Sequence, residues 1–508
     1  MSDEVRHPLR RREFLKRAGL LGGLVLPAGL VSARGGWVDR SQAAAMMGDG
    51  MMGDIAPSPP VVPFQASFRT PSVLTPARVD GDTEYYEIAM RPAEVEILPG
   101  RRTTIWGFNG EFPGPTIRAR RGRRVVVRQT NHLPDAKPSI HLHGGHVEAG
   151  SDGYPTDVIA PGAARDYVYP NRQLASTLSY HDHEMGHAGR NVYMGLFAAY
   201  LIEDDAEAGL GLPSGPYDVP VIIQDRTFGA DGSLQYSPDM MGVSGDVILV
   251  NGVPYPRFDV AGRRYRLRIL NGSNARNYEL SLSSGQSFTQ IATDGGLLPR
   301  PVPRATIPLF PFERVEVVVD FSEVAVGSQV ILRNEAELGR AGQIMLFDVA
   351  RRESETSTIP TELRPLERLD EASAAATRDF ILGMDHMNWV MNGQRFDPGR
   401  IDATPRLGST EIWRFQNRSM MAHPVHLHAD MFQILDRNGT PPSPGETGWK
   451  DTVAVAPDET VRVIVRFTDF LGLYMVHCHN LEHEDNGMMA QFKVVPGVPD
   501  RLDRGTRP

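Results

Sequence analysis

The chain has 508 residues, of which 41% are apolar and 23% charged, and its formal net charge is −9. This composition is typical of a soluble globular protein, and it excludes a collagen, a disordered chain and a polytopic membrane protein. The length predicts three or four domains at about 100–200 residues each. The acidic balance gives no support for a nucleic-acid partner. The chain has 50 glycines and 40 prolines, and their combined share of its residues exceeds the usual share of about 12%. This composition favours short strands and many turns over long helices.

The N-terminus has the features of an export signal. A basic stretch, RRREFLK at residues 10–16, precedes an apolar run from Ala18 to Leu30 and small residues up to Ala33. Such an order is typical of a cleaved signal peptide, and the apolar run is short for a membrane span. Arg-Arg-x-Phe-Leu-Lys resembles the twin-arginine signal. We therefore expect residues 1–33 to engage the twin-arginine export machinery and to send the protein to the periplasm, the cell envelope or the medium. We expect no stable membrane anchor after cleavage; an uncleaved anchor is the alternative.

An internal repeat follows a linker rich in Gly, Met and Pro at residues 34–63. The segments VVVRQTN, YRLRILN and EIWRFQN alternate apolar and polar residues as half-buried strands do, and each ends at Asn. They lie 140 and 146 residues apart, at Val125–Asn131, Tyr265–Asn271 and Glu411–Asn417. A repeat at fixed spacing predicts copies of one structural unit. We therefore expect three all-β domains, at residues 64–205, 206–370 and 371–508.

The histidines lie almost entirely in the first and third repeats. None of the 15 occurs between His187 and His386, so the middle repeat cannot hold a histidine metal site. Two His at positions i and i+2 of a strand project from the same face, so each His-x-His pair can supply two imidazoles to one small space. Ten histidines form four such clusters: His141 and His143; His181 and His183; His423, His426 and His428; His477, His479 and His483.

The single cysteine, Cys478, stands between His477 and His479. In a strand the two His would share one face and the Cys would point to the other, so three residues would link two metal sites. One Cys thiolate, two His and a distant Met make a blue-copper electron-transfer site. Zinc is the main alternative, but a structural zinc site uses four ligands, and the remaining eight His suffice for three further metals. The predicted blue-copper set is His423, Cys478, His483 and Met488.

These clusters resemble the multicopper oxidases, and the resemblance extends over roughly residues 65–497. It implies three consecutive cupredoxin-like Greek-key domains, each a β-barrel or sandwich. It also implies four copper ions: a type 1 copper, and a trinuclear cluster of one type 2 and two type 3 ions between the first and third domains. Several segments are most similar to bacterial spore-coat laccases, bilirubin oxidases and phenoxazinone synthase: GFNGEFPGP at 107–115, YHDH at 180–183, NVYMG at 191–195, ILVNGV at 248–253 and HCHNLEHEDNGMM at 477–489.

The resemblance implies a role for each candidate residue. Asp152 and Glu484 match acids assigned to proton delivery in the spore-coat type, although Asp152-Gly153 is also a good turn former and Glu484 could be a plain surface acid. Cys478 would carry electrons from the type 1 copper to the cluster. The implied ligands are His141 and His426 for type 2; His143, His181 and His479 for one type 3 ion; His183, His428 and His477 for the other; and His423, Cys478, His483 and Met488 for type 1.

The implied function is a laccase-like oxidase. It would couple one-electron oxidation of phenolic, aminophenolic or bilirubin-like donors to the reduction of O2 to water. A metallo-oxidase acting on Cu(I) or Mn(II) is the alternative within the same class. A copper-storage or structural cupredoxin protein is less favoured, because all twelve ligand positions are filled and storage has no use for a path through a cysteine.

Overall fold

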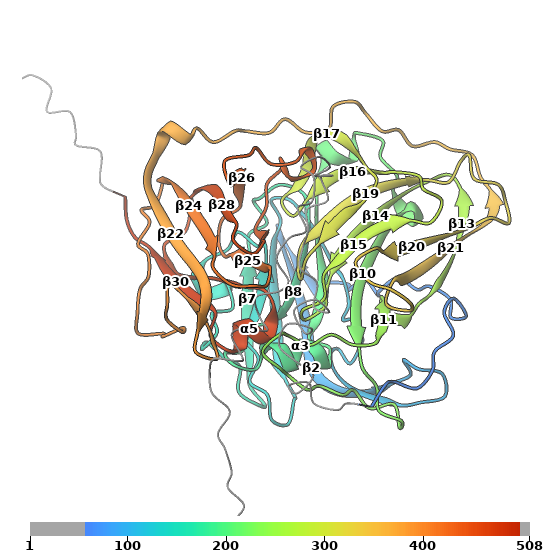
Figure 1. Cartoon of the computed structure of the whole chain (residues 1–508), viewed down its shortest axis with the longest axis horizontal. Coiled ribbons are helices and arrows are strands. Elements are labelled where there is room, and N and C mark those ends of the chain that lie inside the picture. The colour runs from blue at the N-terminus through green and yellow to red at the C-terminus, as the bar shows by residue number, and fades with distance from the viewer. Residues whose placement is uncertain (1–55, 498–508) are drawn as a thin grey trace, which may run out of the picture. The chain divides into compact units, whose positions relative to one another are not determined.

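Short strands dominate the chain, as its glycine and proline content predicts (Figure 1). The computed structural model describes residues 56–497, so the predicted signal segment and most of the predicted linker lie outside the described residues. The end of that linker contacts the second pair of sheets, because Val61 is buried in its core and the Ser58 N–H donates to Asp246. Within the described part of the chain, no helix is long and apolar enough to cross a membrane.

The first pair of sheets spans residues 78–203. One sheet has the order β1-β2-β5-β7 with β3 beside β2, and the other has the order β4-β9-β8-β6. The strands are β1 Arg78–Asp80, β2 Thr83–Val95, β3 Thr103–Phe108, β4 Ile117–Arg120, β5 Arg124–Asn131, β6 Ile140–His143, β7 Ala164–Tyr169, β8 Ser176–Asp182 and β9 Phe197–Glu203; the helices are η1 Ala149–Ser151 and α3 Ala188–Met194.

The second pair spans residues 218–352 and carries the largest apolar core. Its sheets have the orders β12-β11-β10-β14-β19-β16-β17 and β13-β21-β20-β15-β18. The elements, with the two short helices that precede them, are α4 Asp205–Ala208, η2 Gly215–Tyr217, β10 Asp218–Arg226, β11 Val247–Val250, β12 Val253–Pro254, β13 Arg257–Gly262, β14 Arg264–Asn271, β15 Tyr278–Leu282, β16 Phe288–Thr293, β17 Gly296–Arg304, β18 Ile307–Leu309, β19 Arg314–Asp320, β20 Gln329–Asn334 and β21 Gln343–Arg352.

The third pair spans residues 374–494, with sheet orders β23-β22-β24-β28-β26 and β27-β25-β29-β30. All six sheets are open, so the domains are sandwiches and not closed barrels. The all-β prediction is confirmed, whereas the exact domain boundaries stay a prediction. The elements are η3 Glu371–Ser373, β22 Ala374–Asp385, β23 Asn388–Met391, β24 Thr410–Asn417, β25 His423–Leu427, β26 Phe432–Arg437, η4 Pro444–Glu446, β27 Thr452–Val455, β28 Thr460–Arg466, β29 Gly472–Cys478, α5 Leu481–Asp485 and β30 Met489–Val494.

The repeated sequence segments occupy the same place in each pair of sheets. They form β5, β14 and β24, and each lies between a parallel partner on one side and an antiparallel partner on the other. The parallel partners are β2, β10 and β22, and the antiparallel partners are β7, β19 and β28. The sequence repeat therefore corresponds to one strand arrangement used three times.

The asparagine at the end of each repeated strand makes the same hydrogen bonds in all three units. Asn131, Asn271 and Asn417 are buried, and each Nδ2 donates to two backbone carbonyls at 2.6–3.0 Å. Each Oδ1 accepts from the backbone N–H two residues later, at 2.8–3.0 Å. Buried backbone carbonyls need hydrogen-bond donors. In all three units the asparagine side-chain amide supplies these donors at the end of the strand.

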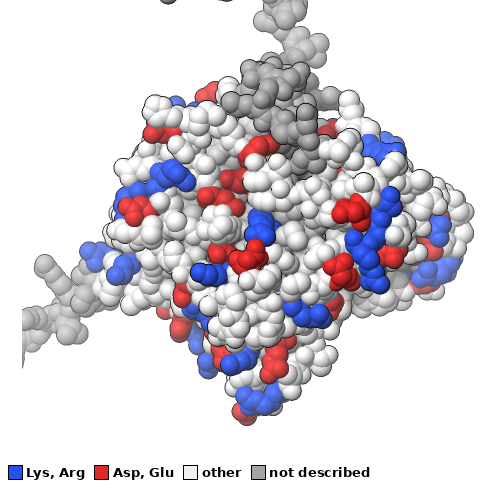
Figure 2. Space-filling model, turned by 90° about the horizontal axis from the view of Figure 1, so that it is seen from below, with Lys and Arg blue, Asp and Glu red and all other residues white. Residues whose placement is uncertain are grey.

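Surface charges of both signs are interspersed over the face seen in Figure 2. Lys and Arg side chains alternate there with Asp and Glu, and wide uncharged areas separate them. The net charge of −9 is therefore not gathered into one acidic field on this face.

We expect Asn271→Asp to destabilise the second pair of sheets. The substitution removes both N–H donors and leaves two buried carbonyls without partners, at about 1–3 kcal/mol for each unsatisfied group. Thermal unfolding followed by circular dichroism should show a lower midpoint than that of the half-buried control Asn277→Asp. Equal midpoints for the two variants would contradict this role for Asn271.

Candidate metal centre

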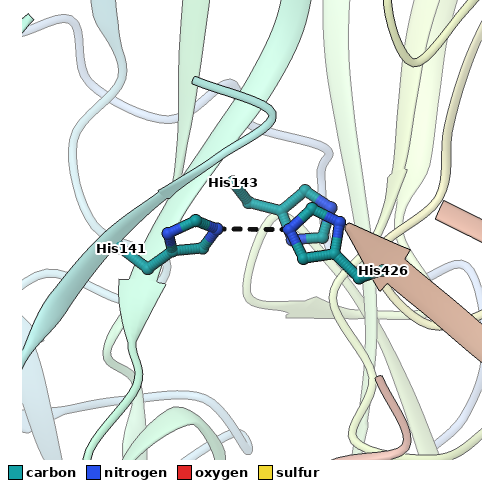
Figure 3. Close-up of side chains that lie close together, drawn as sticks. All are labelled: His141, His143 and His426. Atoms are coloured by element: carbon teal, nitrogen blue, oxygen red, sulfur yellow. Dashed lines mark hydrogen bonds between the residues drawn. The ribbon is translucent and has the colours of Figure 1, made fainter. Parts of the chain in front are cut away.

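Four strands carry the histidine clusters to one place. In the first pair of sheets β6 runs antiparallel to β8, with His141 opposite His181. In the third pair β25 runs antiparallel to β29, with His426 opposite His477. Ring nitrogens from the two pairs then contact each other directly, as Figure 3 shows for His141 and His426. None of the ten clustered histidines is more than 1% exposed.

Cys478 and two histidines form a compact group on one side of β29. The Cys478 Sγ lies 3.4 Å from His423 Nδ1 and 3.6 Å from His483 Nδ1, and the two nitrogens are 3.2 Å apart. The fully buried Met488 lies close by, because its carbonyl accepts from the Cys478 N–H at 3.0 Å and its N–H donates to the His483 carbonyl at 2.9 Å. The structure thus brings together the four residues of the predicted blue-copper set.

The other eight histidines gather on the opposite side of β29. His141 Nε2 lies 3.3 Å from His426 Nε2, and His143 Nδ1 lies 3.0 Å from His479 Nε2. His477 Nε2 lies 3.3 Å from His183 Nε2 and 3.1 Å from His428 Nε2. The ligand atoms within each of three groups lie within 4.8 Å of one another: His141, His143 and His426; His143, His181 and His479; and His183, His428 and His477.

The chemistry of these side chains fits a transition metal. Burial lowers the pKa of nine of the ten histidines, which keeps these rings neutral, so that one nitrogen of each carries no proton and can donate a lone pair. His181 Nε2 is buried, and no described residue forms a hydrogen bond with it. Burial raises the pKa of the Cys478 thiol, so a bound cation would be needed to hold it as a thiolate. Imidazole and thiolate together select copper or zinc over hard cations.

The outer nitrogens of the cluster histidines are held by two acids that the sequence singled out. Asp152 Oδ2 lies 2.7 Å from His428 Nδ1, and its backbone carbonyl lies 2.6 Å from His141 Nδ1. Glu484 lies between two rings, with 3.4 Å to His183 Nδ1 and 3.1 Å to His477 Nδ1. Burial raises the pKa of Glu484. Such contacts fix the tautomer and orientation of a metal-binding imidazole.

Asp152 also belongs to a tight turn, as the alternative interpretation held. Gly153 has a φ of +80°, and a Cβ there would lie 2.5 Å from the Ile140 carbonyl. Only glycine fits this approach to β6. The turn explains Gly153, whereas the contact with His428 explains why the residue before it is acidic.

Several side chains beside the two sites gave no signal in the sequence. Phe312 stacks on His479 with ring centroids 3.8 Å apart, although it comes from the histidine-free second pair of sheets. Trp389 lies over His483 at 4.2 Å, and its Nε1 donates to the Met240 carbonyl at 2.6 Å. Asp451 and Arg314 form a buried ion pair beside His143. No spacing or periodicity marks these residues, because packing between separate sheets brings them to the site.

The fold and the site together define a class of protein. Sandwich domains that bury one Cys/His group and one eight-histidine cluster, joined by a single strand, are typical of a copper-dependent oxidoreductase. Comparison with known proteins agrees with this class. Multicopper oxidase family models match residues 89–207 and residues 368–498.

Three similar proteins illustrate the match. A laccase of Bacillus subtilis (strain 168) is 36% identical over 514 residues, spanning 85% of this chain and 98% of that protein. A bilirubin oxidase of Albifimbria verrucaria is 35% identical over 445 residues, spanning 82% of this chain and 77% of that protein. The crystal structure of a laccase from Pediococcus acidilactici superposes with a TM-score of 0.81 at 36% identity, covering 87% of this chain and 96% of that one.

The chain therefore belongs to the multicopper oxidase family. The predicted resemblance and the predicted cupredoxin-like fold are confirmed, and the protein is a laccase-like, copper-dependent oxidoreductase. Members of this family use O2 and an electron donor. Copper as the cofactor is likewise confirmed, whereas the assignment of each ligand to a particular ion stays a prediction.

We expect copper binding to tolerate mild acid. Protons compete with copper for an ordinary histidine below its pKa of about 6.5. Burial lowers the pKa of His183, His423 and His477 to about 3, so these rings stay unprotonated well below that pH. Copper per chain after equilibrium dialysis should be unchanged between about pH 7 and about pH 5. The same chain in denaturant, where the rings regain ordinary pKa values, should release copper in this range; release near pH 6.5 by the native chain would contradict the expectation.

Proposed function

We propose that this protein oxidises phenolic, aminophenolic or bilirubin-like donors at a type 1 copper and reduces O2 to water at a trinuclear cluster. Bound copper would supply the one-electron oxidation of the donor and the four-electron reduction of O2. The observation that carries the proposal is the arrangement on β29, where Cys478 faces one group of ligands and its neighbours His477 and His479 face the other.

The distances between side chains support a specific assignment of ligands. His423, Cys478 and His483, with Met488 beside them, would hold the type 1 ion. His141 and His426 would hold the type 2 ion, since their Nε2 atoms face each other at 3.3 Å. The remaining two groups would each hold a type 3 ion: His143, His181 and His479, and His183, His428 and His477.

Cys478 would provide the path between donor and cluster. It is bonded through the chain to both His477 and His479, so a continuous covalent path joins the two groups of ligands. A cysteine with no second thiol in the chain cannot form a disulfide within the chain. Its burial at 0% exposure also protects it from modification by solvent reagents.

Asp152 and Glu484 would supply protons for O2 reduction. Asp152 Oδ2 contacts His428, and the Glu484 carboxylate contacts His183 and His477, so each acid lies one side chain away from the proposed cluster. A carboxylate at this distance can hold a proton that a copper-bound imidazole cannot give up.

Three segments around His423 and His483 would shape the donor site. Trp389, on the β22–β23 hairpin, covers both rings. Its Nε1 donates to the carbonyl of Met240, which comes from the second pair of sheets. Ser419, in the loop before β25, contacts His423 Nε2 at 2.7 Å. Because Trp389 is itself only 2% exposed, it shields both rings, and a donor would meet the exposed residues of these segments.

A metal-ion donor is the second candidate. Met387 and Met420 are more than half exposed and lie on two of these three segments. Thioethers bind Cu(I) well. Metallo-oxidase activity toward Cu(I) or Mn(II) is therefore kept as the alternative, although the matched laccases and bilirubin oxidase favour organic donors.

Export by the twin-arginine route is part of the proposal. The motif at residues 10–16 supports it, and a protein without disulfides gains nothing from folding in an oxidising compartment. Replacing Arg11 and Arg12 by Lys should leave the protein in the cytoplasm, measured by cell fractionation. Unchanged export of this variant would refute the route but not the oxidase activity.

A panel of donors tests the proposed function directly. Copper-loaded protein should be blue and should consume O2 with an aminophenol or bilirubin faster than with Cu(I) or Mn(II). Copper-free protein is the control. A blue protein that oxidises only the metal ions would establish the alternative, and a colourless protein inert to every donor would refute both.

We expect Cys478→Ser to abolish both colour and turnover. A hydroxyl does not replace the thiolate that gives the type 1 ion its blue absorption. The eight-histidine cluster should still hold copper, so about three ions per chain should remain by metal analysis. Near-normal turnover by this variant would contradict the assignment of Cys478.

We expect Asp152→Asn to slow only the half-reaction with O2. The change keeps the size of the side chain and removes its acidic group. General acid catalysis is worth about 10²–10⁴-fold, so reoxidation should slow at least about tenfold, while reduction by the donor stays normal. Stopped-flow recording of the blue band follows both half-reactions. Asp157→Asn, on the same loop but paired with Arg165 at the surface, is the control; equal reoxidation rates in the two variants would leave Asp152 as a turn residue.

A further inference from the structure

A buried arginine from the second pair of sheets lies beside the eight-histidine cluster. Arg314 begins β19, and its side chain is 1% exposed. Its Nη1 and Nη2 donate to the two oxygens of Asp451 at 2.7 and 2.6 Å, which makes a bidentate pair. Its Nε donates to the Thr177 carbonyl on β8 at 2.9 Å. One guanidinium therefore contacts the third pair of sheets and the strand of the first pair that carries His181.

Asp451 also forms hydrogen bonds with two histidines. Its Oδ1 accepts from His143 Nε2 at 3.0 Å, and its backbone carbonyl accepts from His426 Nδ1 at 2.9 Å. Those two rings stack with centroids 3.7 Å apart. Because the outer nitrogen of His143 is bonded to Asp451, its Nδ1 is the atom that points at His479. The Thr452 hydroxyl lies 3.0 Å from His143 Nε2 and 3.2 Å from His426 Nδ1, and it donates to Asp451 Oδ1. Asp451, with Thr452 beside it, thus sets which nitrogen each ring presents to the cluster.

The chain leaves space for this ion pair directly after His143. Gly144 has a φ of +80°, and a Cβ there would lie 2.5 Å from Asp451 Oδ2 and 2.6 Å from Arg314 Nη2. Any other side chain would push the pair away from β6. The close approach therefore requires glycine at this position.

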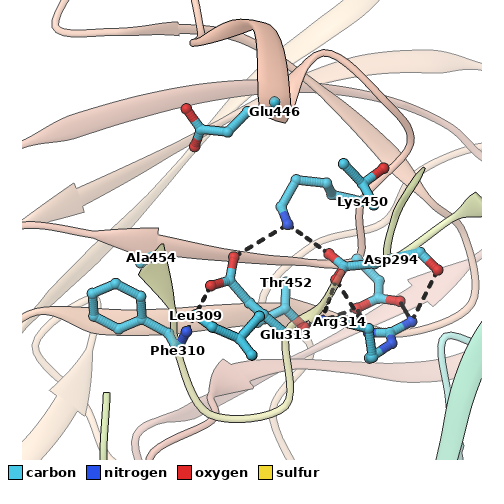
Figure 4. Close-up of polar contacts among 12 residues, drawn as sticks. Asp294, Leu309, Phe310, Glu313, Arg314, Glu446, Lys450, Thr452 and Ala454 are labelled. Atoms are coloured by element: carbon cyan, nitrogen blue, oxygen red, sulfur yellow. Dashed lines mark hydrogen bonds and ion pairs between the residues drawn. The ribbon is translucent and has the colours of Figure 1, made fainter. Parts of the chain in front are cut away.

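Further buried charges hold Arg314 in place, as Figure 4 shows. Asp294 Oδ1 accepts from the Arg314 backbone N–H at 2.8 Å, and Asp294 Oδ2 pairs with Lys450 Nζ at 2.8 Å. Lys450 also pairs with Glu313 at 3.2 Å. Replacing buried ion pairs by apolar residues is often neutral or stabilising. The network is therefore weak evidence for stability, whereas its fixed contacts are suited to orienting the groups around it.

We propose that Arg314 and Asp451 are positioning residues through which the ligand-free second pair of sheets sets the orientation of His426, and with it the type 2 copper site. The same pair orients His143, which the proposed function assigns to a type 3 ion. The inference rests on the proposed function, because it takes His141 and His426 as the type 2 ligands. Outer contacts of this kind typically change metal affinity or activity by about 10–100-fold when they are removed.

Arg314→Gln tests the proposal, with Arg276→Gln as the matched control. Arg276 is also buried in the second pair of sheets and pairs with Asp225 at 2.9 Å, so both variants leave one buried carboxylate without its arginine. In the copper-loaded full chain, Arg314→Gln should alter the type 2 signal in electron paramagnetic resonance and weaken type 2 copper binding by about 10–100-fold. The blue band per chain should stay normal. Arg276→Gln should lower the thermal midpoint and leave both copper signals unchanged.

Two further variants keep the test decisive if Arg314→Gln does not fold. Arg314→Lys retains the charge but loses the bidentate fork, and Asp451→Asn retains the size of the side chain. Each should alter the type 2 signal. The double variant, Arg314→Lys with Asp451→Asn, should change this signal no more than the more severe single variant does, because the two residues act as one unit.

The outcomes separate this proposal from the proposed function. A wild-type type 2 signal and full copper content in the folded Arg314 variants would overturn the positioning role alone. Equal changes in the Arg314 and Arg276 variants would also overturn it, since they would show a general loss of stability. A wild-type chain that binds no copper would overturn the proposed function, and the positioning role with it.

Discussion

The structure depends on keeping ten imidazoles and one thiol dry and close together. Burying a polar group without a partner costs free energy, and nine of these histidines have their pKa lowered by that burial. Copper on the inner nitrogens, with acids and carbonyls on outer ones, would offset this cost. Because the first and third pairs of sheets each bring only part of the ligand set, neither could form the cluster alone.

The β-strand is the element that makes this arrangement possible. Successive side chains of a strand point to opposite faces, so His477 and His479 can enter the cluster while Cys478 enters the other group. In a helix the same three residues would be spread around the axis at about 100° intervals, with no shared face. The short path between the two sites is thus a consequence of the local backbone, and α5 then returns His483 to the side that Cys478 occupies.

How far the sequence predicts this structure depends on whether a feature is local. Asn131, Asn271 and Asn417 end their strands with the same hydrogen bonds, and alternation along single strands predicted which histidines share a face. Arg314, Asp451 and Trp389 could not be found in this way. Each acts on a residue from another strand or another sheet pair, and an arginine or tryptophan in a strand is common enough to carry no signal of its own.

The second pair of sheets supplies no metal ligand, yet the site depends on it. A cluster formed between two units needs a third contact that fixes their relative rotation, because a small rotation would separate ring nitrogens that now lie 3.0–3.3 Å apart. Apolar packing resists separation but is not directional, whereas a guanidinium fork holds a carboxylate in one orientation. Arg314 contacts Thr177 in the first pair and Asp451 in the third. The second pair of sheets therefore fixes the orientation of a site whose metal-binding atoms all come from the first and third pairs.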